Sequence, residues 1–143
     1  MVPCYLYNPE LVLENEHVVI YFDRTIHTHK TLQNNRPDIT VIDKTKSCIH
    51  LVDIAVPLNR NLQKIYGEKM RKYSDLAYEL KAGNKHRSVF ILPIVISSTG
   101  IIEKHVSEHI KKLDIDSKII KIMQKVVILN TCHIVRKFLQ SDN

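Results

Sequence analysis

Short apolar runs separated by polar segments occupy the first two thirds of the chain and predict β-strands. Residues 17–27 contain the contiguous β-branched and aromatic run VVIYF, which favours a strand. Two further apolar runs, 39–42 and 48–56, flank the polar stretch 43–47 and predict a β-hairpin. Residues 88–96 are mostly apolar and form a run too short for most helices, so we expect a buried strand there.

Helical periodicity appears between these runs and again at the end of the chain. Residues 61–82 are predicted to be helical because their apolar side chains recur at helical spacing: Leu62, Ile65, Tyr66, Met70, Tyr73, Leu76, Ala77 and Leu80. Gly83 and Asn84 are typical of a helix C-terminus. Helices are also predicted over 102–113 and 117–139, the second with Asp116 as its N-cap, and Pro9 could start a helical turn within 5–16.

The order of these elements predicts the fold class. Three strands are followed by a helix, a fourth strand and two helices, and a strand–helix–strand crossover places the fourth strand parallel to the third. The sequence therefore predicts an α/β protein with a small mixed central β-sheet flanked by helices and a helical C-terminal tail. All 143 residues are assigned to this single domain, since that length suits one core and is short for two.

Composition narrows the class of protein. Hydrophobic residues make up 44% of the chain and charged residues 25%, which is typical of an ordered globular domain. The three cysteines, Cys4, Cys48 and Cys132, are far apart and form no CxxC pair, so we expect reduced thiols in an intracellular protein. No apolar run approaches the roughly 20 residues that span a bilayer, and the first residues lack signal-peptide features, so no membrane partner is expected.

Positive charge is concentrated in one segment. Residues 60–87 contain eight basic and three acidic residues, which supply +5 of the net +6. A local basic excess is typical of a protein that binds a phosphate backbone, although a solvated helix face has the same composition. The residues predicted to contact nucleic acid are Arg36, Lys64, Arg71, Tyr73, Lys81, Lys85 and Arg87.

Two aspartates stand at the ends of the predicted hairpin. Asp38 follows Arg36 and Pro37, and Asp53 comes after fourteen intervening residues. Folding the hairpin brings the two acids together, because paired residues on neighbouring strands lie about 5 Å apart. Carboxylates at that separation repel each other unless a divalent metal ion compensates them, so Mg²⁺ or Mn²⁺ is expected. Alternatively, Asp38 is a turn residue after proline, whereas Asp53 within an apolar strand would otherwise be a costly half-buried charge.

Several segments in this order carry a family resemblance. An aspartate at the head of the second strand and an acid late in the third resemble the PD-(D/E)xK restriction-endonuclease-like superfamily. More specifically, the chain resembles the restriction-like endonuclease domain of non-LTR retrotransposon polyproteins from about residue 9 to residue 139. The segments that carry this likeness are VLEN (12–15), RPDITVIDK (36–44), VDIAVP (52–57), EKMRKYSDL (68–76), LPIVI (92–96), QKVVILNT (124–131) and RKFL (136–139).

The resemblance implies roles for particular residues. Asp38 and Asp53 match the metal-binding acids, and the carbonyl of Ile54 matches the backbone ligand. The superfamily's usual lysine position is Ala55 here, and the resemblance instead places the catalytic lysine on the following helix, at Lys69 or Lys72. We favour Lys69, with Lys72 and Tyr73 as neighbours that contact phosphate or water. Glu14 loosely matches an acid that often precedes the first strand.

The function implied by the resemblance is metal-dependent nicking of DNA, in the nucleus of a eukaryotic host. The implied partners are DNA and, in a parent polyprotein, element RNA or a reverse transcriptase region. Two alternatives stay open: a catalytically silent nucleic-acid-binding remnant, and a translation product without a selected function. Separately, His27 with His29 and His105 with His109 could bind a transition metal, but no cysteine or third histidine stands nearby in the sequence to predict a zinc site.

Overall fold

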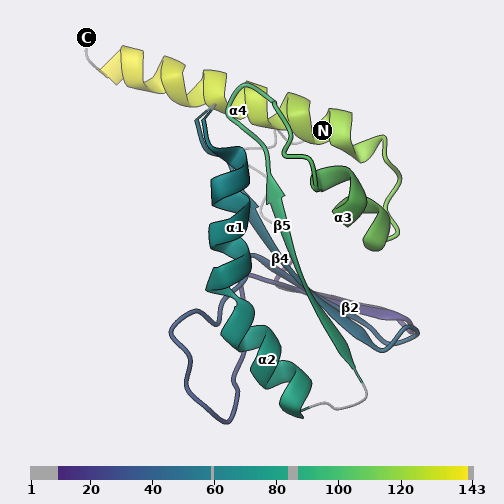
Figure 1. Ribbon diagram of the computed structural model, residues 1–143. Helices are drawn as coiled ribbons and strands as arrows, with labels where there is room; N and C mark the ends of the chain where they lie inside the picture. The colour runs from purple at the N-terminus through teal and green to yellow at the C-terminus, as the bar shows by residue number, and fades with distance from the viewer. Residues whose placement is uncertain (1–9, 59, 84–86, 142–143) are drawn as a thin grey trace.

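A five-stranded mixed β-sheet forms the centre of the computed structural model, which describes residues 10–58, 60–83 and 87–141 (Figure 1). The strands lie in chain order, the first four antiparallel and the last parallel to its neighbour. Their bounds are β1 Val12–Glu14, β2 Val18–Phe22, β3 Ile39–Asp43, β4 Cys48–Ala55 and β5 Ser88–Val95. The predicted hairpin (β3–β4) and the parallel crossover (β4–β5) are both confirmed.

In the described part of the chain, four helices flank this sheet: α1 Leu62–Lys72, α2 Ser74–Gly83, α3 Val106–Lys112 and α4 Ile119–Ser141. Helices α1 and α2 lie on one side of the sheet and α3 on the other, while α4 crosses one end and extends beyond the rest of the molecule (Figure 1). The predicted α/β class, with helices flanking a small mixed sheet and a helical C-terminal tail, is confirmed. Within the described residues, no helix is both long and apolar enough to span a bilayer.

Strand β4 separates two hydrophobic cores because its successive side chains point to opposite faces. On one face, Ile49 and Leu51 pack with Tyr73 and Leu76 from the α1–α2 side. On the other face, Val52 belongs to a cluster with residues of β5, α3 and the adjoining loop: Leu92, Ile94, Ile96, Val106 and Ile110. Asp53, at an odd position like Ile49 and Leu51, therefore belongs to the α1–α2 face.

Several element boundaries differ from the sequence prediction. The strand predicted over 17–27 covers only Val18–Phe22. The helix predicted over 61–82 is interrupted at Tyr73, where φ is −104° and ψ is 6°. The helix predicted to start at 102 begins only at Val106, because Ile102 pairs with Ile96 as an antiparallel bridge. Residues 12–14 form a strand rather than part of a helical turn, and Pro9 lies outside the described residues. Apolar periodicity detects neither a one-residue break in a helix nor an isolated bridge between residues six positions apart.

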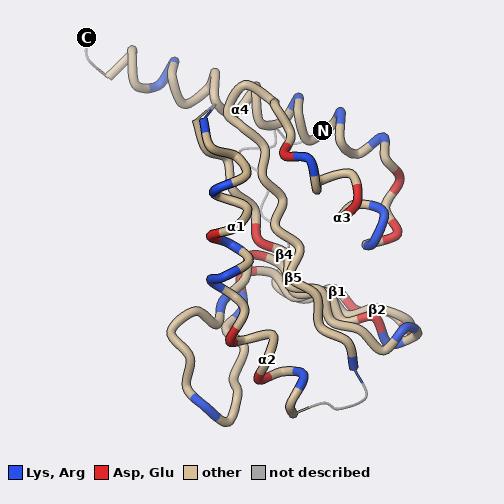
Figure 2. Tube along the Cα trace, viewed as in Figure 1, with Lys and Arg blue, Asp and Glu red and all other residues tan. Residues whose placement is uncertain are grey.

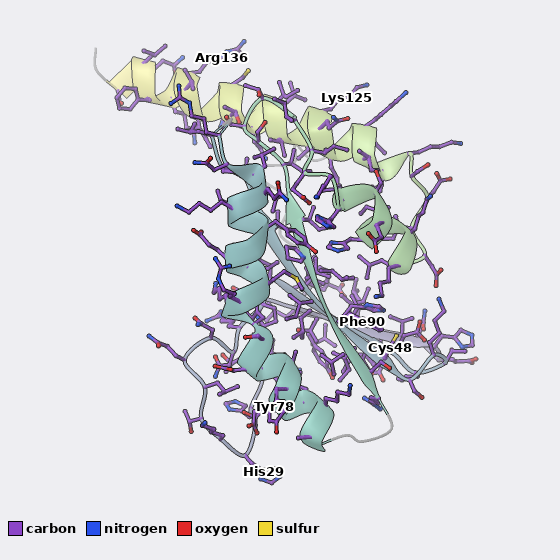
Figure 3. The ribbon with its side chains drawn as sticks, viewed as in Figure 1. His29, Cys48, Tyr78, Phe90, Lys125 and Arg136 are labelled. Atoms are coloured by element: carbon purple, nitrogen blue, oxygen red, sulfur yellow. The ribbon has the colours of Figure 1, made fainter. Side chains whose placement is uncertain are left out.

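The C-terminal half of α4 carries apolar side chains that the sheet does not cover. Leu129, Ile134, Phe138 and Leu139 are all more than half exposed, at 61–66%. Basic side chains on the same helix, among them Lys125 and Arg136, point away from the sheet (Figure 3). The helix is therefore held mainly through its first half, where Ile119, Ile120, Met123 and Val127 pack on the core.

Gly100 is the position where we expect a single methyl group to weaken the fold. Its φ is +89°, and an added Cβ would lie 2.9 Å from Cδ1 of Ile128 on α4. Gly100→Ala is expected to lower the free energy of unfolding by about 1–3 kcal/mol, measured by urea denaturation. The matched control is Gly83→Ala at the end of α2, where an added Cβ meets nothing within 4 Å, so an equal loss there would contradict the explanation.

Candidate active site

The hairpin places the two predicted acids at adjacent positions. Ile39 of β3 pairs with Val52 of β4, and Asp38 and Asp53 lie one step beyond this pair on their respective strands. Asp38 Oδ2 accepts a hydrogen bond of 2.7 Å from the backbone N–H of Ile54. The antiparallel register therefore brings together two carboxyl groups separated by fourteen residues in the sequence, as the hairpin predicted.

Asp53 is the buried centre of this cluster, with 2% of its surface exposed. Lys69 of α1 forms an ion pair with Asp53, and its Nζ lies 2.6 Å from Asp53 Oδ2. The geometry of this contact is not that of a hydrogen bond. The Tyr73 hydroxyl donates to Asp53 Oδ1 at 3.1 Å and lies 3.3 Å from the carbonyl oxygen of Arg36. The buried carboxylate thus has a counterion and a hydrogen-bond donor, which its burial requires.

Lys69 and Tyr73 reach Asp53 because they stand one helical turn apart on the same face of α1. The backbone N–H of Tyr73 donates to the carbonyl of Lys69 at 3.4 Å, so the turn continues up to the break between α1 and α2. Tyr73 itself is only 1% exposed. The prediction that Tyr73 contacts nucleic acid is therefore wrong, since its side chain is buried and positions the carboxylate of Asp53.

The electrostatics of the cluster follow from this crowding. Burial raises the pKa of Asp38 above its ordinary value, and the neighbouring Asp53 raises it further, against the lowering effect of the Ile54 N–H. Burial, followed by the two aspartates, also raises the pKa of Tyr73, so the tyrosine remains a neutral hydroxyl donor. Two adjacent carboxyl groups therefore share one positive neighbour, which is the electrostatic setting in which a divalent cation is favoured.

The carbonyl of Ile54 points to the same side of β4 as Asp38. The Ala55 carbonyl accepts from Ile96 N at 3.1 Å, on the β5 side. Successive carbonyls of an extended strand point in opposite directions, so the Ile54 oxygen is directed away from β5, toward the position of Asp38. The backbone ligand implied by the resemblance is thus on the correct side of the strand.

These groups fit a hard divalent ion. Mg²⁺ retains several water ligands and is commonly held by one or two carboxylates, so two aspartates and a carbonyl are a sufficient donor set. Within the part of the chain that the structure describes, no group of three or more His, Cys, Asp or Glu side chains is placed to hold a metal. Water would therefore have to complete the coordination at Asp38 and Asp53.

Glu14 is not brought to this cluster. It lies on β1 opposite Val19, and Val19 in turn pairs with Ile42, three residues further along β3 than Ile39. Its carboxylate accepts a hydrogen bond of 2.8 Å from Lys44 Nζ. The weakly predicted role of Glu14 at the site therefore has no geometric support.

The predicted nucleic-acid contacts fall into several environments. Arg36 pairs in a bidentate manner with Asp23, at 2.8 and 3.0 Å, which reduces its availability for phosphate. Basic residues occur along α1, beside the acidic cluster, whereas α2 carries acidic residues and one lysine, Lys81, near its end (Figure 2). Of the remaining candidates, Lys64, Arg71 and Lys81 are exposed, Arg87 is half-buried, and Lys85 lies outside the described residues.

Lys72, the second candidate for the catalytic lysine, is exposed, and its Nζ lies 4.9 Å from the centroid of the Tyr73 ring. This contact is of the cation–π type. It places Lys72 beside the cluster but on the outer side of Tyr73, whereas Lys69 touches Asp53 directly. The structure therefore distinguishes the two candidate lysines, because only Lys69 contacts Asp53.

Asp23 is a neighbour of the site that the sequence analysis missed. Its backbone N–H donates to the carbonyl of Asp38 at 2.8 Å, and its side chain holds Arg36. Asp23 has a positive φ of 50°, a conformation in which aspartate is enriched, and it directly follows β2. No spacing in the sequence indicated this contact, because it depends on the bend after β2.

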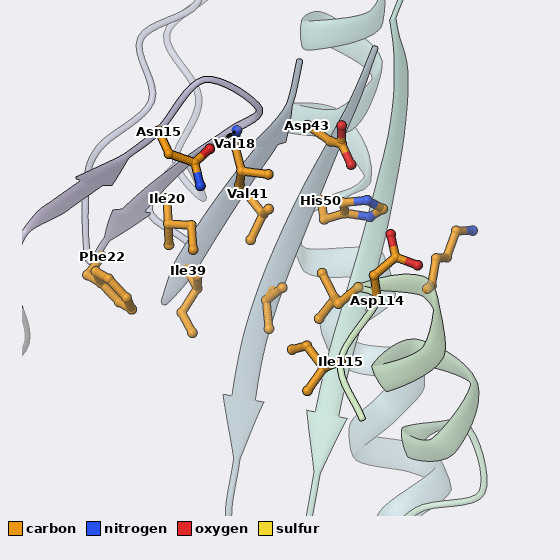
Figure 4. Close-up of a pocket in the computed structure, with 13 residues that line it drawn as sticks. Asn15, Val18, Ile20, Phe22, Ile39, Val41, Asp43, His50, Asp114 and Ile115 are labelled. Atoms are coloured by element: carbon orange, nitrogen blue, oxygen red, sulfur yellow. Dashed lines mark hydrogen bonds between the residues drawn. The ribbon is translucent and has the colours of Figure 1, made fainter. Parts of the chain in front are cut away.

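A separate cavity of about 450 Å³ lies over β2 and β3, on the face away from α1 (Figure 4). Its walls are largely apolar, with Val18, Ile20, Phe22, Ile39 and Val41 among the lining residues. The acidic cluster does not line it, so this cavity and the candidate active site are distinct features.

Burial and, after it, the neighbouring Asp53 raise the pKa of Asp38, which predicts a dependence of stability on pH. A raised pKa means that the folded state holds the Asp38 proton more tightly than the unfolded chain does. The stabilisation from this proton is complete below the ordinary value of 3.8 and is lost as pH rises through the raised pKa. Asp38→Asn is therefore expected to stabilise the metal-free protein at pH 7 by less than about 1 kcal/mol, since solvent screens this exposed group.

Urea denaturation at pH 7 and at steps down to pH 4 measures this effect. The advantage of Asp38→Asn should shrink as pH falls. A variant that is less stable than wild type at pH 7 would show that the charged hydrogen bond from Ile54 N–H outweighs the combined effect of burial and repulsion by Asp53.

Comparison with known proteins identifies no relative of this chain. No protein-family model matches the sequence, and no curated protein matches it either. The acidic cluster and its lysine are therefore the basis for assigning a function.

Proposed function

We propose that this chain is a metal-dependent DNA endonuclease domain that nicks DNA, similar to the restriction-like endonuclease domain of non-LTR retrotransposons. The observation that carries the proposal is the buried Asp53, which contacts Lys69 at 2.6 Å and lies beside Asp38. A carboxylate in the middle of a sheet destabilises the fold unless it is compensated, and an acid pair with a lysine is a common arrangement for phosphodiester hydrolysis.

Some residues of the cluster would bind the metal ion, and others would stabilise charge or hold Asp53 in position. Asp38, Asp53 and the Ile54 carbonyl would hold Mg²⁺ or Mn²⁺. When bound, the ion supplies a Lewis acid for the phosphate and lowers the pKa of its water. Lys69 carries the positive charge that offsets negative charge developing on the phosphoryl oxygens, and Tyr73 keeps Asp53 in place.

The proposed reaction is hydrolysis of one strand. A water oxygen bonds to phosphorus, the bond from phosphorus to the 3′ oxygen breaks, and one water proton ends on that oxygen. The products are a 5′-phosphate and a 3′-hydroxyl. In the elements that the chain resembles, such a 3′ end primes reverse transcription. Element RNA and a reverse transcriptase region are accordingly proposed partners besides DNA, and the nucleus is the proposed location.

The basic surface beside the cluster supports DNA as the substrate. Lys64, Arg71 and Lys72 are exposed on the same helix as Lys69. Their positive charge attracts the phosphate backbone and would bring a phosphodiester to the acids of β3 and β4. Binding through such contacts weakens steeply with salt.

The test is nicking of a supercoiled plasmid by the purified chain with Mg²⁺ or Mn²⁺, and with EDTA as the metal-free control. Conversion to the open circular form that requires the metal supports the proposal. A folded protein that leaves the plasmid supercoiled with both metals would overturn it.

A second candidate function is a catalytically silent nucleic-acid-binding module. The ion pair between Lys69 and Asp53 favours it, because this contact compensates the buried charge without any metal ion. Such a module would bind DNA in a salt-sensitive manner without cutting it, and Asp38→Ala would leave its affinity unchanged. Fluorescence anisotropy with labelled DNA, run beside the plasmid assay, distinguishes the two functions.

A further inference from the structure

Two histidines of the α3 region lie one helical turn apart and are not part of the proposed nuclease site. The backbone N–H of His109 donates to the carbonyl of His105 at 3.0 Å, so both residues belong to the same turn. Spacing of i and i+4 places their side chains on one face. Sequence spacing alone did not predict a metal site here, because it offered no third ligand.

Each imidazole is held in place through its Nδ1 atom. His105 Nδ1 lies 2.7 Å from Oε1 of Glu103, whose residue is 3% exposed and whose Oε2 accepts from the His105 N–H at 2.8 Å. His109 Nδ1 lies 3.0 Å from the carbonyl oxygen of Pro93. Carbonyl and carboxylate oxygens accept hydrogen bonds, so Nδ1 carries the proton in both rings and Nε2 keeps its lone pair. Metal-binding histidines are typically oriented in this way.

The two rings are close enough to share one ion. Their centroids are 6.1 Å apart. With metal–nitrogen bonds of about 2.1 Å, two imidazoles on a tetrahedral ion have centroids roughly 5.3 Å apart, so the pair needs to close by less than about 1 Å. Tyr66 of α1 stacks on His105 at 4.1 Å and lies 5.8 Å from His109, which holds both rings from one side.

Both acidic and basic side chains surround His109, since Lys112 lines the same cavity as Glu108. Glu103 and Glu108 are both near enough to favour positive charge at His109. His109 lines a cavity of about 320 Å³ together with Tyr66 and Glu108, which leaves room for water ligands.

We propose that His105 and His109 form a binding site for a single borderline transition-metal ion, Zn²⁺ or Ni²⁺, through their Nε2 atoms. Glu103 orients His105, and water completes the coordination. Imidazole nitrogen prefers such ions, whereas carboxylate and carbonyl oxygens prefer Mg²⁺ or Mn²⁺. The site is therefore chemically distinct from the acids at Asp38 and Asp53, and it does not depend on the proposed nuclease function.

Isothermal titration of the chelator-treated chain with NiCl₂ or ZnCl₂ tests the proposal. We expect one equivalent of metal whose affinity falls at least about tenfold in His105→Ala and in His109→Ala. Glu103→Gln is also expected to weaken binding by about tenfold or more, through loss of the carboxylate that orients His105. The double variant His27→Ala/His29→Ala is the matched control and should retain the site.

Wild-type affinity in His105→Ala/His109→Ala, or loss of the site in the His27→Ala/His29→Ala control, would overturn the proposal. Should the α3 variants fail to fold, paramagnetic resonance of Cu²⁺ bound to the His27→Ala/His29→Ala protein decides the question. Hyperfine coupling to two imidazole nitrogens supports the site, and coupling to none or one overturns it. Retention of Zn²⁺ by Asp53→Asn would show that the histidine site stands even if the nuclease proposal fails.

Discussion

Asp53→Asn is expected to abolish metal-dependent nicking, with a fall of at least about 10³-fold in the rate of plasmid relaxation. The substitution removes the carboxylate that lies 2.6 Å from Lys69, but its amide oxygen can still accept the hydrogen bond from Tyr73. The charge that holds the metal is therefore lost while the shape of the site is retained. The rate is measured on supercoiled plasmid at saturating Mg²⁺ or Mn²⁺.

Glu14→Gln is the matched control for Asp53→Asn. Glu14 is also an acid predicted at the site, but the structure pairs it with Lys44 at 2.8 Å on β1. Its variant should nick at the wild-type rate. If Asp53→Asn remains active, or if Glu14→Gln is equally inactive, the assignment of Asp53 as a metal ligand is wrong.

Lys69→Met is expected to reduce nicking by about 10²–10³-fold, because it removes the positive charge proposed to stabilise the phosphoryl oxygens. It should also destabilise the protein by about 1–3 kcal/mol, since Asp53 is left buried without its counterion. The expected loss of unfolding free energy is smaller than for a fully buried ion pair, because the Lys69 side chain is 25% exposed. Plasmid relaxation and urea denaturation measure the two effects separately.

Two further variants separate catalysis from stability. Lys72→Met removes an exposed ammonium on the outer side of Tyr73 and should leave stability unchanged, with a much smaller effect on nicking. Lys69→Met/Asp53→Asn should recover most of the lost stability, because no buried charge remains, yet stay inactive. Wild-type nicking by Lys69→Met together with loss in Lys72→Met would move the catalytic role to Lys72.

Much of the fold follows from local patterns. Contiguous apolar runs rich in β-branched residues predict where β2, β4 and β5 lie, and the polar stretch between two apolar runs predicts the β3–β4 hairpin. The helix between β4 and β5 makes their parallel pairing the expected topology. Because hairpin register places residues 38 and 53 opposite each other, the proximity of the two acids was also predictable from the sequence.

Other features of the site arise only from tertiary packing. The sequence offers Lys69 and Lys72 equally, but packing of α1 on the sheet brings only Lys69 to Asp53. The same packing buries Tyr73, which the sequence analysis predicted to contact nucleic acid. Arg36 is turned to Asp23 by the bend after β2, and neither partner is near the other in sequence.

The sequence by itself determined the fold class, the hairpin with its two acids, and the helical spacing of His105 and His109. Only the tertiary structure decided which lysine reaches the acids, that Glu14 does not, and that Glu103 and Pro93 orient the two imidazoles. The physical reason is that sequence patterns report local interactions, whereas most of these contacts join residues that are far apart in the chain. Periodicity and turn residues act over a few positions, whereas these contacts depend on how α1 and the α3 region pack on the sheet.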